Sequence, residues 1–253
     1  MVRRYVRHIA LAEIGAAGQE RLARSRVVVV GLGALGGHIA LHLARSGVGH
    51  IRIIDRDIVE EENLQRQVLY DENDVRAGLP KAVAAAQRLA SVNSSVKIDP
   101  RIAALRSDNA RMLLSDCDIV LDGTDNLETR FLINDFCVRY DVPWVFGAVL
   151  ATSGLVAPIV PHKTPCLRCI FKQIPPPAVL PTCQTYGVLN TVPALIAALQ
   201  TTLAYRILLG KSPDQKLLFV DLWKSSFFDV EIARWEECPT CVKNEFEFLK
   251  GDK

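Results

Sequence analysis

Short apolar runs alternate with amphipathic segments through the first 150 residues of the chain. Four valines at 27–30 form an uninterrupted apolar run that ends in a glycine, and such runs are typical of strands covered on both faces. A helix is predicted at 34–46 and a second strand at 51–55. Together they form a β-α-β unit whose length suits a parallel crossover.

The same alternation continues along the chain. Helices are predicted at 9–23, 80–89, 108–114 and 126–140, and strands at 96–98, 118–122 and 144–149. Such alternation is typical of an open parallel sheet. The sequence therefore predicts an α/β fold with a Rossmann-like, mostly parallel sheet and helices on both faces.

The pattern changes after residue 150. Segments 154–160, 217–221 and 227–232 look like strands that extend the sheet by antiparallel pairing. Prolines at 175–177 and 181 disfavour regular structure, so a mobile loop is predicted at about 172–187. The most apolar long stretch, 193–209, is interrupted by polar residues and is short for a membrane span. We expect it to form a buried helix.

Composition excludes some classes of function. A chain of 253 residues buries a core that needs no disulfides. A formal net charge of +2 gives no electrostatic basis for binding nucleic acid or an anionic membrane. The basic amino terminus lacks the apolar stretch and cleavage site of an export signal. A cytoplasmic location is expected, where thiols stay reduced.

A glycine-rich motif, G-x-G-x-x-G, joins the first strand to the next helix at Gly31, Gly33 and Gly36. Glycines let the backbone turn sharply beside a phosphate, and the helix amino terminus offers unpaired N–H groups. Asp55 ends the following strand, where it suits a ribose. These residues indicate a nucleotide without deciding between ATP and NAD. A purely structural role in helix–strand packing also stays open.

Charged residues beyond Asp55 favour phosphoryl chemistry. Residues just past the carboxyl ends of parallel strands converge on one crevice, so Arg66, Lys81 and Asp125 are expected there. Bringing a carboxylate onto the α-phosphate of ATP needs cations, which Arg66 and Lys81 supply. Asp125 suits Mg²⁺, which prefers oxygen ligands. Each residue alone has an ordinary structural role, as a surface charge or a helix cap, and their joint placement favours ATP.

Several segments match one family in residue type and in order. They are 4–7 (RYVR), 31–36, 55–57 (DRD), 63–67 (NLQRQ), 78–81 (GLPK), 124–126 (TDN), 166–169 (CLRC), 182–183 (TC) and 238–241 (CPTC). In these segments the chain resembles the family that contains MoeB, ThiF and the adenylation domains of ubiquitin-activating enzymes. His8, Ala34, Glu62 and Gly123 depart from the usual residues of this family, but none of the departures removes a charged catalytic group.

The resemblance implies a role for each site residue. Asn63, Arg66 and Lys81 would bind the ATP phosphates and support catalysis, and Asp125 would coordinate Mg²⁺. Arg7 would reach the ATP of a neighbouring subunit, because members of the family are typically homodimers. The nucleotide-binding set expected is Gly31, Gly33, Ala34, Gly36, Asp55, Asp57, Asn63, Arg66, Lys81, Asp125 and Asn126.

The resemblance also implies an activity. The chain would be a single ThiF-type adenylation domain, 1–253, in which residues 1–150 bind ATP and residues 151–253 bind a carrier. It would adenylate the C-terminal glycine carboxylate of a small ubiquitin-fold sulfur carrier ending in Gly-Gly and release pyrophosphate. The pathway would be molybdopterin or thiamin-type sulfur transfer, with a sulfur-donor protein as a further partner. The sequence does not name the cognate carrier.

Three other functions are weighed against this one. The chain could activate a ubiquitin-like protein modifier through a thioester at Cys183, although it shows no separate catalytic-cysteine domain, ubiquitin-fold domain or rhodanese-like extension. An NAD-dependent oxidoreductase is supported only by the glycine loop and Asp55. A non-catalytic dimer that merely docks a partner conflicts with the intact Arg66, Lys81 and Asp125.

Four cysteines form two C-x-x-C pairs, Cys166 with Cys169 and Cys238 with Cys241. Each pair can occupy two corners of a tetrahedral Zn²⁺ site. Four protein ligands leave no open position, so we expect a structural clamp that ties the proline-rich region to the C-terminal segment. Unpaired or redox-active pairs are the alternative.

Cys183 follows Thr182 in the predicted mobile loop. The resemblance implies that it attacks the adenylate or forms a persulfide link. A role as a small apolar residue, which Cys117 and Cys137 are expected to have, stays open.

Overall fold

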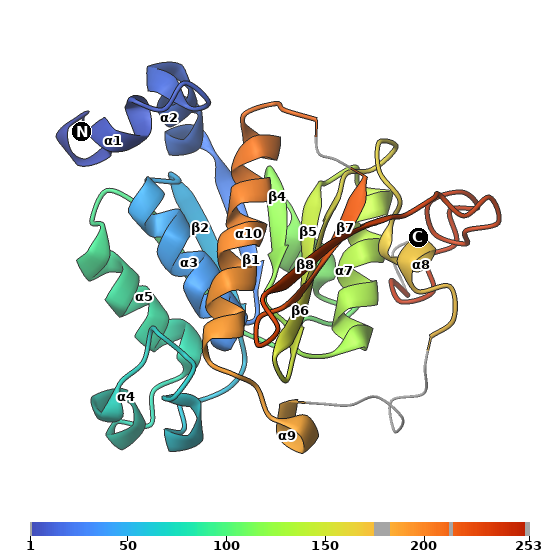
Figure 1. Ribbon diagram of the computed structural model, residues 1–253. Helices are drawn as coiled ribbons and strands as arrows, with labels where there is room; N and C mark the ends of the chain where they lie inside the picture. Colours follow the sequence, from blue (N-terminus) through green and yellow to red (C-terminus); the bar gives the residue numbers. More distant parts are fainter. Residues whose placement is uncertain (1, 175–182, 213–214, 251–253) are drawn as a thin grey trace.

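A computed structural model describes residues 2–174, 183–212 and 215–250, which form one eight-stranded sheet in the order β3-β2-β1-β4-β5-β6-β7-β8 (Figure 1). The strands are β1 Arg26–Val30, β2 His50–Asp55, β3 Lys97–Ile102, β4 Ile119–Asp122, β5 Trp144–Leu150, β6 Ser153–Ile159, β7 Lys216–Asp221 and β8 Ser226–Glu231. Strands β1 to β5 pair in parallel, and β5 to β8 pair antiparallel. The predicted Rossmann-like sheet with an antiparallel extension is therefore confirmed.

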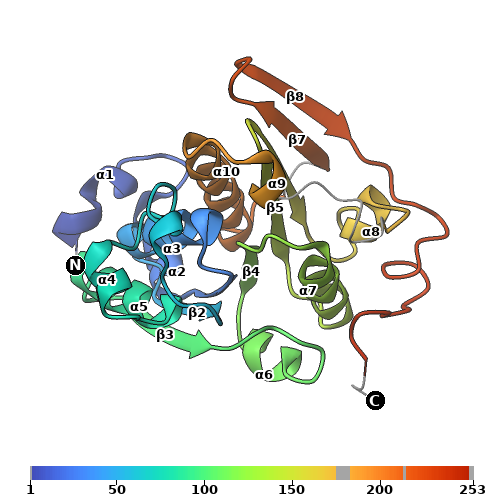
Figure 2. The same ribbon diagram turned by 90° about the horizontal axis from the view of Figure 1, so that it is seen from below.

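Helices lie on both faces of the sheet (Figure 2). They are η1 Val2–Tyr5, α1 Val6–Ile9, α2 Gly15–Arg24, α3 Ala34–Ser46, η2 Glu61–Asn63, α4 Glu72–Arg76, α5 Lys81–Val92, α6 Ala110–Leu114, α7 Leu127–Arg139, α8 Leu167–Ile170, α9 Cys183–Tyr186 and α10 Thr191–Leu208. Helices α3, α5 and α10 pack on one face, and α6 and α7 on the other.

Alternation along β1 divides the core between these two faces. Val27 and Val29 face the cluster built with α3, α5 and α10, whereas Val28 and Val30 face the cluster built with α6 and α7. Successive side chains of a strand point to opposite faces, so a run of four buried valines needs apolar cover on both. The apolar run in the sequence is uninterrupted because β1 is covered on both faces.

Strands β1, β2, β4 and β5 end at the same edge of the sheet, which we call the carboxyl edge. Pairing of Leu150 with Ser153, and of Ser153 with Asp221, brings the end of β7 and the β7–β8 turn to this edge as well. Helices α4 and α9 lie at this end of the molecule, whereas α1 and α2 lie at the opposite end (Figure 1). The carboxyl edge therefore collects segments from most of the described chain.

Helix α10 is long and apolar enough to cross a membrane by length and composition alone, with a mean hydropathy of 1.3 over 18 residues. It packs instead on the sheet and on α3, and its polar residues Gln200 and Thr201 are buried with hydrogen bonds. A core helix meets the same criteria. The structure thus supports the predicted buried helix.

The structure differs from the sequence-based expectations at three places. The helix expected at 9–23 begins only at Gly15, the first residue of α2, whose φ of +61° is left-handed; α1 ends at Ile9. Helix α4 was not expected, although Asp71 and Asp74 form a capping box at its start. Of the loop expected at about 172–187, residues 175–182 lie outside the described residues, and Cys183–Tyr186 form α9.

Candidate functional site

The glycine loop packs directly against the turn that follows β4. A Cβ atom on Gly31, whose φ is +83°, would meet the carbonyl oxygen of Gly123 at 2.6 Å. A Cβ atom on Gly36 would collide with the carbonyl oxygen of Gly31. The loop, the first turn of α3 and the β4–α7 turn are therefore in backbone contact, and side chains larger than hydrogen would separate them. Gly33 is the N-cap of α3 and Ala34 its first residue.

Asp55 ties the glycine loop to the end of β2. Its Oδ2 accepts a hydrogen bond from the backbone N–H of Leu32 at 2.7 Å, and its Oδ1 accepts one from the N–H of Asp57 at 2.8 Å. Burial raises the pKa of Asp55, and the two N–H donors and the charge of Lys81 oppose this effect. The carboxylate is thus fixed beside the loop, and its role as a ribose ligand stays a prediction.

Lys81 brings a buried cation to the same place. It is the first residue of α5 and is only 7% exposed. Its backbone N–H donates to the carbonyl of Asp57 at 2.8 Å, and its Nζ lies 3.4 Å from Asp57 Oδ2. Buried lysines are rare unless paired, and Asp57 is largely exposed. The structure therefore brings Asp55, Asp57 and Lys81 together at the carboxyl edge.

In the part of the chain that the structure describes, two buried amide side chains, one at the end of η2 and one just after it, have oxygen atoms without hydrogen-bond partners. They are Oδ1 of Asn63 and Oε1 of Gln67. Gln67 was missed as a site residue, yet its Nε2 lies 3.8 Å from where a Cβ of Gly33 would be. Unsatisfied buried polar atoms are uncommon, so these two oxygens are candidates for contact with a water or a ligand. Arg66 lies between them in sequence, half-buried, with Nη1 donating to the carbonyl of Glu62 at 2.6 Å.

Asp125 and Asn126 are exposed on the β4–α7 turn. Asn126, rather than Asp125, is the N-cap of α7, because its Oδ1 accepts from the N–H of Thr129 at 2.9 Å. Among the described residues, Asp125 has one hydrogen bond, from Asn126 Nδ2 at 3.4 Å. Its carboxylate therefore keeps most of its capacity to bind a ligand.

Arg7 is not brought to this site. It lies on α1 and lines a cavity of about 310 Å³ with Arg4, Arg45 and Tyr205. Arg45 is near the carboxyl end of α3, whereas the glycine loop precedes the amino end of that helix. A helix of 13 residues is ~20 Å long, so Arg7 and the loop of the same chain are separated by about that length.

Cys183 is the first residue of α9, and its side chain lies outside the described part of the structure. The backbone of this segment is close to the carboxyl edge. The N–H of Ala151, just past β5, donates to the carbonyl of Gly187 at 3.1 Å. The reactivity of Cys183 stays a prediction.

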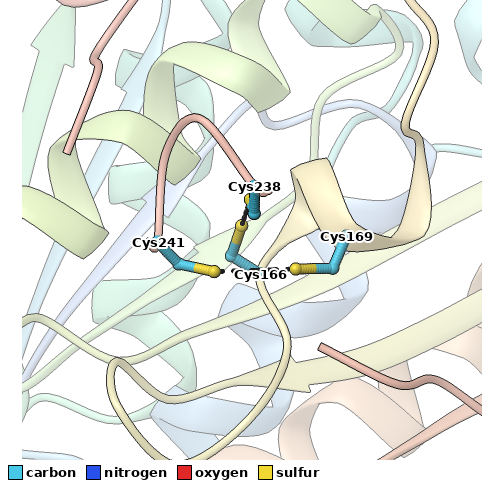
Figure 3. Close-up of side chains that lie close together, drawn as sticks. All are labelled: Cys166, Cys169, Cys238 and Cys241. Carbon is cyan, nitrogen blue, oxygen red and sulfur yellow. Dashed lines mark hydrogen bonds between the residues drawn. The ribbon is translucent and has the colours of Figure 1, made fainter. Parts of the chain in front are cut away.

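The four cysteines of the C-x-x-C pairs converge on one point (Figure 3). The Sγ atoms of Cys166 and Cys238, and those of Cys169 and Cys241, are each 3.6 Å apart, and all four lie within 4.8 Å of one another. Sulfur atoms at the corners of a tetrahedron with Zn–S bonds of about 2.3 Å are ~3.8 Å apart. The spacing fits zinc and is far too long for disulfides.

The surroundings of the cluster favour thiolate at two positions. Hydrogen bonding with Cys166 lowers the pKa of Cys238 to about 7. Hydrogen bonds from its cysteine neighbours lower the pKa of Cys169. The backbone N–H of Trp235 also donates to Cys169 Sγ at 3.4 Å. Because thiolate is the form that binds metal, this arrangement suits a four-thiolate Zn²⁺ site.

Two neighbouring residues of α7 hold the two halves of this clamp. Asn134 Oδ1 accepts a hydrogen bond from the N–H of Leu167, beside Cys166, at 2.8 Å. Asp135 accepts from the Thr240 hydroxyl at 3.1 Å and from the N–H of Phe248 at 2.8 Å. The C-terminal segment is thus attached to α7 by a buried carboxylate.

Asp135 should give stability a measurable pH dependence. Burial raises its pKa to about 6, above the ordinary 3.8, although its hydrogen bonds oppose the change. The folded state therefore binds this proton more tightly than the unfolded state does. The stabilisation that protonation of Asp135 provides is lost as pH rises through about 6. Between pH 7 and pH 5, we expect the stability of the wild type relative to Asp135→Asn to increase by about 1 kcal/mol.

Urea unfolding of both proteins at several pH values would measure this difference. The comparison cancels the carboxylates whose pKa is lowered, such as Asp99 and Asp71, because both proteins contain them. A stability difference that does not change with pH would contradict the prediction.

Comparisons with known proteins agree with this geometry. The profile of the ThiF family matches residues 5–240. A sulfur carrier protein ThiS adenylyltransferase of Bacillus subtilis is 39% identical over 251 residues, covering 98% of this chain and 74% of that relative. A SAMP-activating enzyme E1 of Haloferax volcanii is 40% identical over 240 residues, covering 94% of this chain and 88% of that relative.

A solved structure supports the fold. The crystal structure of E. coli MccB matches with a TM-score of 0.81 and 23% identity, covering 94% of this chain and 72% of that chain. The family profile matches most of the chain, and the two relatives are each at least 39% identical to it. The chain belongs to the ThiF family.

Proposed function

We propose that the protein uses ATP to adenylate the C-terminal glycine carboxylate of a small ubiquitin-fold sulfur carrier that ends in Gly-Gly. The observation that carries the proposal is the contact of a buried cation, Lys81, with the Asp55–Asp57 turn beside the glycine loop. Transfer of a phosphoryl group needs cations against the charge that develops on the phosphates, whereas hydride transfer develops no such charge. The names of the two relatives, a ThiS adenylyltransferase and a SAMP-activating enzyme, support the substrate class.

The nucleotide would lie along the carboxyl edge. Gly31, Gly33, Ala34 and Gly36 would pass close to its phosphates, and Asp55 would accept hydrogen bonds from the ribose. Asn63 and Gln67, with their unpartnered buried oxygens, would complete the pocket. Asp57 would orient Lys81, and Asn126 would support the turn that carries Asp125.

The substrate carboxylate would be the nucleophile. One of its oxygens forms a bond to the α-phosphorus of ATP, while the bond from that phosphorus to pyrophosphate breaks and its electron pair leaves on pyrophosphate. Arg66 and Lys81 would offset the negative charge that collects in this step. Mg²⁺, for which the exposed Asp125 carboxylate is a suitable oxygen ligand, would neutralise phosphate charge. No enzyme nucleophile is needed.

We also propose a homodimer in which Arg7 serves the partner's site. Its separation of about one helix length from the glycine loop of its own chain supports this arrangement. Arg4, Arg7 and Arg45 bring positive charge to one cavity, which suits a position facing anionic phosphates. Size-exclusion chromatography with light scattering would test the oligomeric state.

Residues 151–253 would form the carrier-binding part of a single domain, and 1–150 the ATP-binding part. The β7–β8 hairpin exposes Trp223, Phe227 and Phe228 at a free edge of the sheet, and its turn lies at the carboxyl edge. Exposed aromatic patches are typical of protein interfaces. A carrier that docked there could extend its C-terminal tail to the nucleotide.

This docking surface is testable. Trp223 is 76% exposed, so Trp223→Ala should leave stability nearly unchanged and raise the KM for the carrier about tenfold or more. The KM for ATP should stay the same. Met112→Ala is a matched control, because Met112 is an apolar side chain of α6 that is 71% exposed. Equal KM values for the carrier in the two variants would contradict a docking surface at Trp223.

The four cysteines would hold a structural Zn²⁺, and Cys183 would act after adenylation, either by a persulfide link to the carrier or by a thioester to a protein modifier. A cytoplasmic location, where thiols stay reduced, would suit both. A Cys183→Ala variant that keeps pyrophosphate exchange but loses the later transfer would support this role. If every step persists, Cys183 is structural.

Pyrophosphate exchange tests the proposed function directly. Labelled pyrophosphate should appear in ATP only when a ubiquitin-fold carrier with an intact Gly-Gly terminus is present. A matched carrier that lacks the last two glycines is the control. Absence of exchange with every such carrier, together with tight binding of NADH, would favour the oxidoreductase alternative and overturn the proposal.

A further inference from the structure

A buried ion pair lies directly beneath the β4–α7 turn. Asp122, the last residue of β4, is 0% exposed, and its Oδ2 accepts a hydrogen bond from Nε of Arg130 at 3.0 Å. Its Oδ1 accepts from the backbone N–H of Thr124 at 2.9 Å and from the Thr124 hydroxyl at 2.6 Å. Burying two charges costs desolvation free energy that apolar packing would not. None of the nucleotide-binding residues described above accounts for this pair.

Arg130 connects three segments. Its Nη2 donates to the carbonyl of Thr124 at 2.6 Å and to the carbonyl of Gly147 on β5 at 3.1 Å. The guanidinium is stacked over Phe146, 5.5 Å from the ring centre, and the residue is 8% exposed. The planar guanidinium fixes its donors in one fork, which a lysine cannot reproduce. The carbonyl that precedes Asp125 is therefore held by a rigid, buried donor.

The same turn is held from two further sides. Gln200 of α10 donates from Nε2 to the carbonyl of Asp122 at 2.9 Å and to that of Val145 at 3.2 Å. On the opposite side, Gly123 is packed against the backbone of Gly31. The backbone on either side of Asp125 thus has little freedom, although the Asp125 side chain is exposed.

We infer that Arg130 is a positioning residue: paired with Asp122, it fixes the β4–α7 turn so that the Asp125 carboxylate stays beside the glycine loop for the divalent cation of the nucleotide. This inference rests on the proposed function. Misplacing a ligand by about 1 Å can cost on the order of 100-fold in rate. A lysine at position 130 keeps the charge next to Asp122, but it cannot serve both carbonyls in the same geometry.

The test is the Mg²⁺ dependence of ATP binding, measured by calorimetry without carrier. Mg²⁺ should increase the affinity for ATP. Arg130→Lys should raise by about tenfold the Mg²⁺ concentration that gives half of this increase, and should leave the affinity for ATP without Mg²⁺ unchanged. Arg52→Lys is the matched control. Arg52 also pairs with an aspartate, Asp99, at 3.0 Å and donates to two carbonyls, but it holds α6 to β2. Even if Arg52→Lys loses as much stability as Arg130→Lys, its ATP binding should depend on Mg²⁺ as in the wild type.

A double-mutant cycle gives a second measurement. In an Asp125→Ala background, Arg130→Lys should have no further effect on Mg²⁺ dependence, because it acts through Asp125. If Arg130→Lys changes only thermal stability, or if its effect persists without Asp125, the inference is overturned. These binding experiments need no carrier, so they are independent of pyrophosphate exchange, whose absence in the wild type would overturn the proposed function instead.

Discussion

Lys81→Ala should lower the rate of carrier-dependent pyrophosphate exchange by about 100- to 1,000-fold, which is the usual cost of removing one preorganised donor from a transition state. Lys81 is buried at the start of α5, so its charge is little screened by water. The fall should appear mainly in kcat, because negative charge accumulates on the phosphates as the carboxylate attacks. Initial rates with labelled pyrophosphate measure it.

Asp57→Asn separates charge from structure in this prediction. If Lys81 served only to hold the turn at Asp57, which lies 3.4 Å from its Nζ, both variants would lose the same activity. We expect Asp57→Asn to cost much less, since it leaves the cation in place. Circular dichroism would confirm that both variants are folded. Lys81→Ala with a wild-type kcat would contradict the assignment of Lys81.

Cys238→Ser should remove bound zinc and lower the melting temperature by about 10 °C or more. A domain of this size loses about 2–4 °C for each kcal/mol of stability, so the drop corresponds to roughly 3 kcal/mol or more. Cys238 and Cys166 are 72 positions apart, and losing the metal releases the cross-link between their segments. Calorimetry and elemental analysis of zinc measure the two quantities.

Cys117→Ser is the control for this variant, because Cys117 lies outside the four-cysteine cluster. Its zinc content should equal that of the wild type. Four protein ligands leave no open position on the metal, so any folded Cys238→Ser protein should keep exchange activity at low temperature. A wild type without zinc, with equal melting temperatures for both variants, would contradict a structural metal.

The sequence predicted the parts of the site that depend on local order. The glycine loop, Asp55 and the two cysteine pairs follow from where strands end and from ligand spacing, and the structure brings them to the expected places. Local order could also have found α4, because the Asp71–Asp74 capping box is readable in the sequence. The start of this helix at Gly15 instead of Ile9 was the harder case, since a single glycine does not by itself mark a helix boundary.

Tertiary contacts decided what the sequence could not show. Gln67 belongs to the matching segment 63–67 and Arg130 to none, but only their burial against other segments points to a role for each. The proposed role of Arg7 would depend on a second subunit, which periodicity within one chain does not describe. The contacts of buried polar residues such as Gln67 and Arg130 come from other segments of the chain, so only the three-dimensional structure identifies these residues.

Helix α7 connects the turn that carries Asp125 with the four-cysteine cluster. It begins just after Asp125 and carries Asn134 and Asp135, which hold the cysteine clamp, in its later turns. If zinc binding changes the affinity for nucleotide through this strut, thermodynamic reciprocity requires nucleotide to change the affinity for zinc by the same factor. If that change is an increase, saturating ATP would lower the fraction of zinc that a chelator removes at equilibrium. Zinc retention would then report occupancy of the distant nucleotide site.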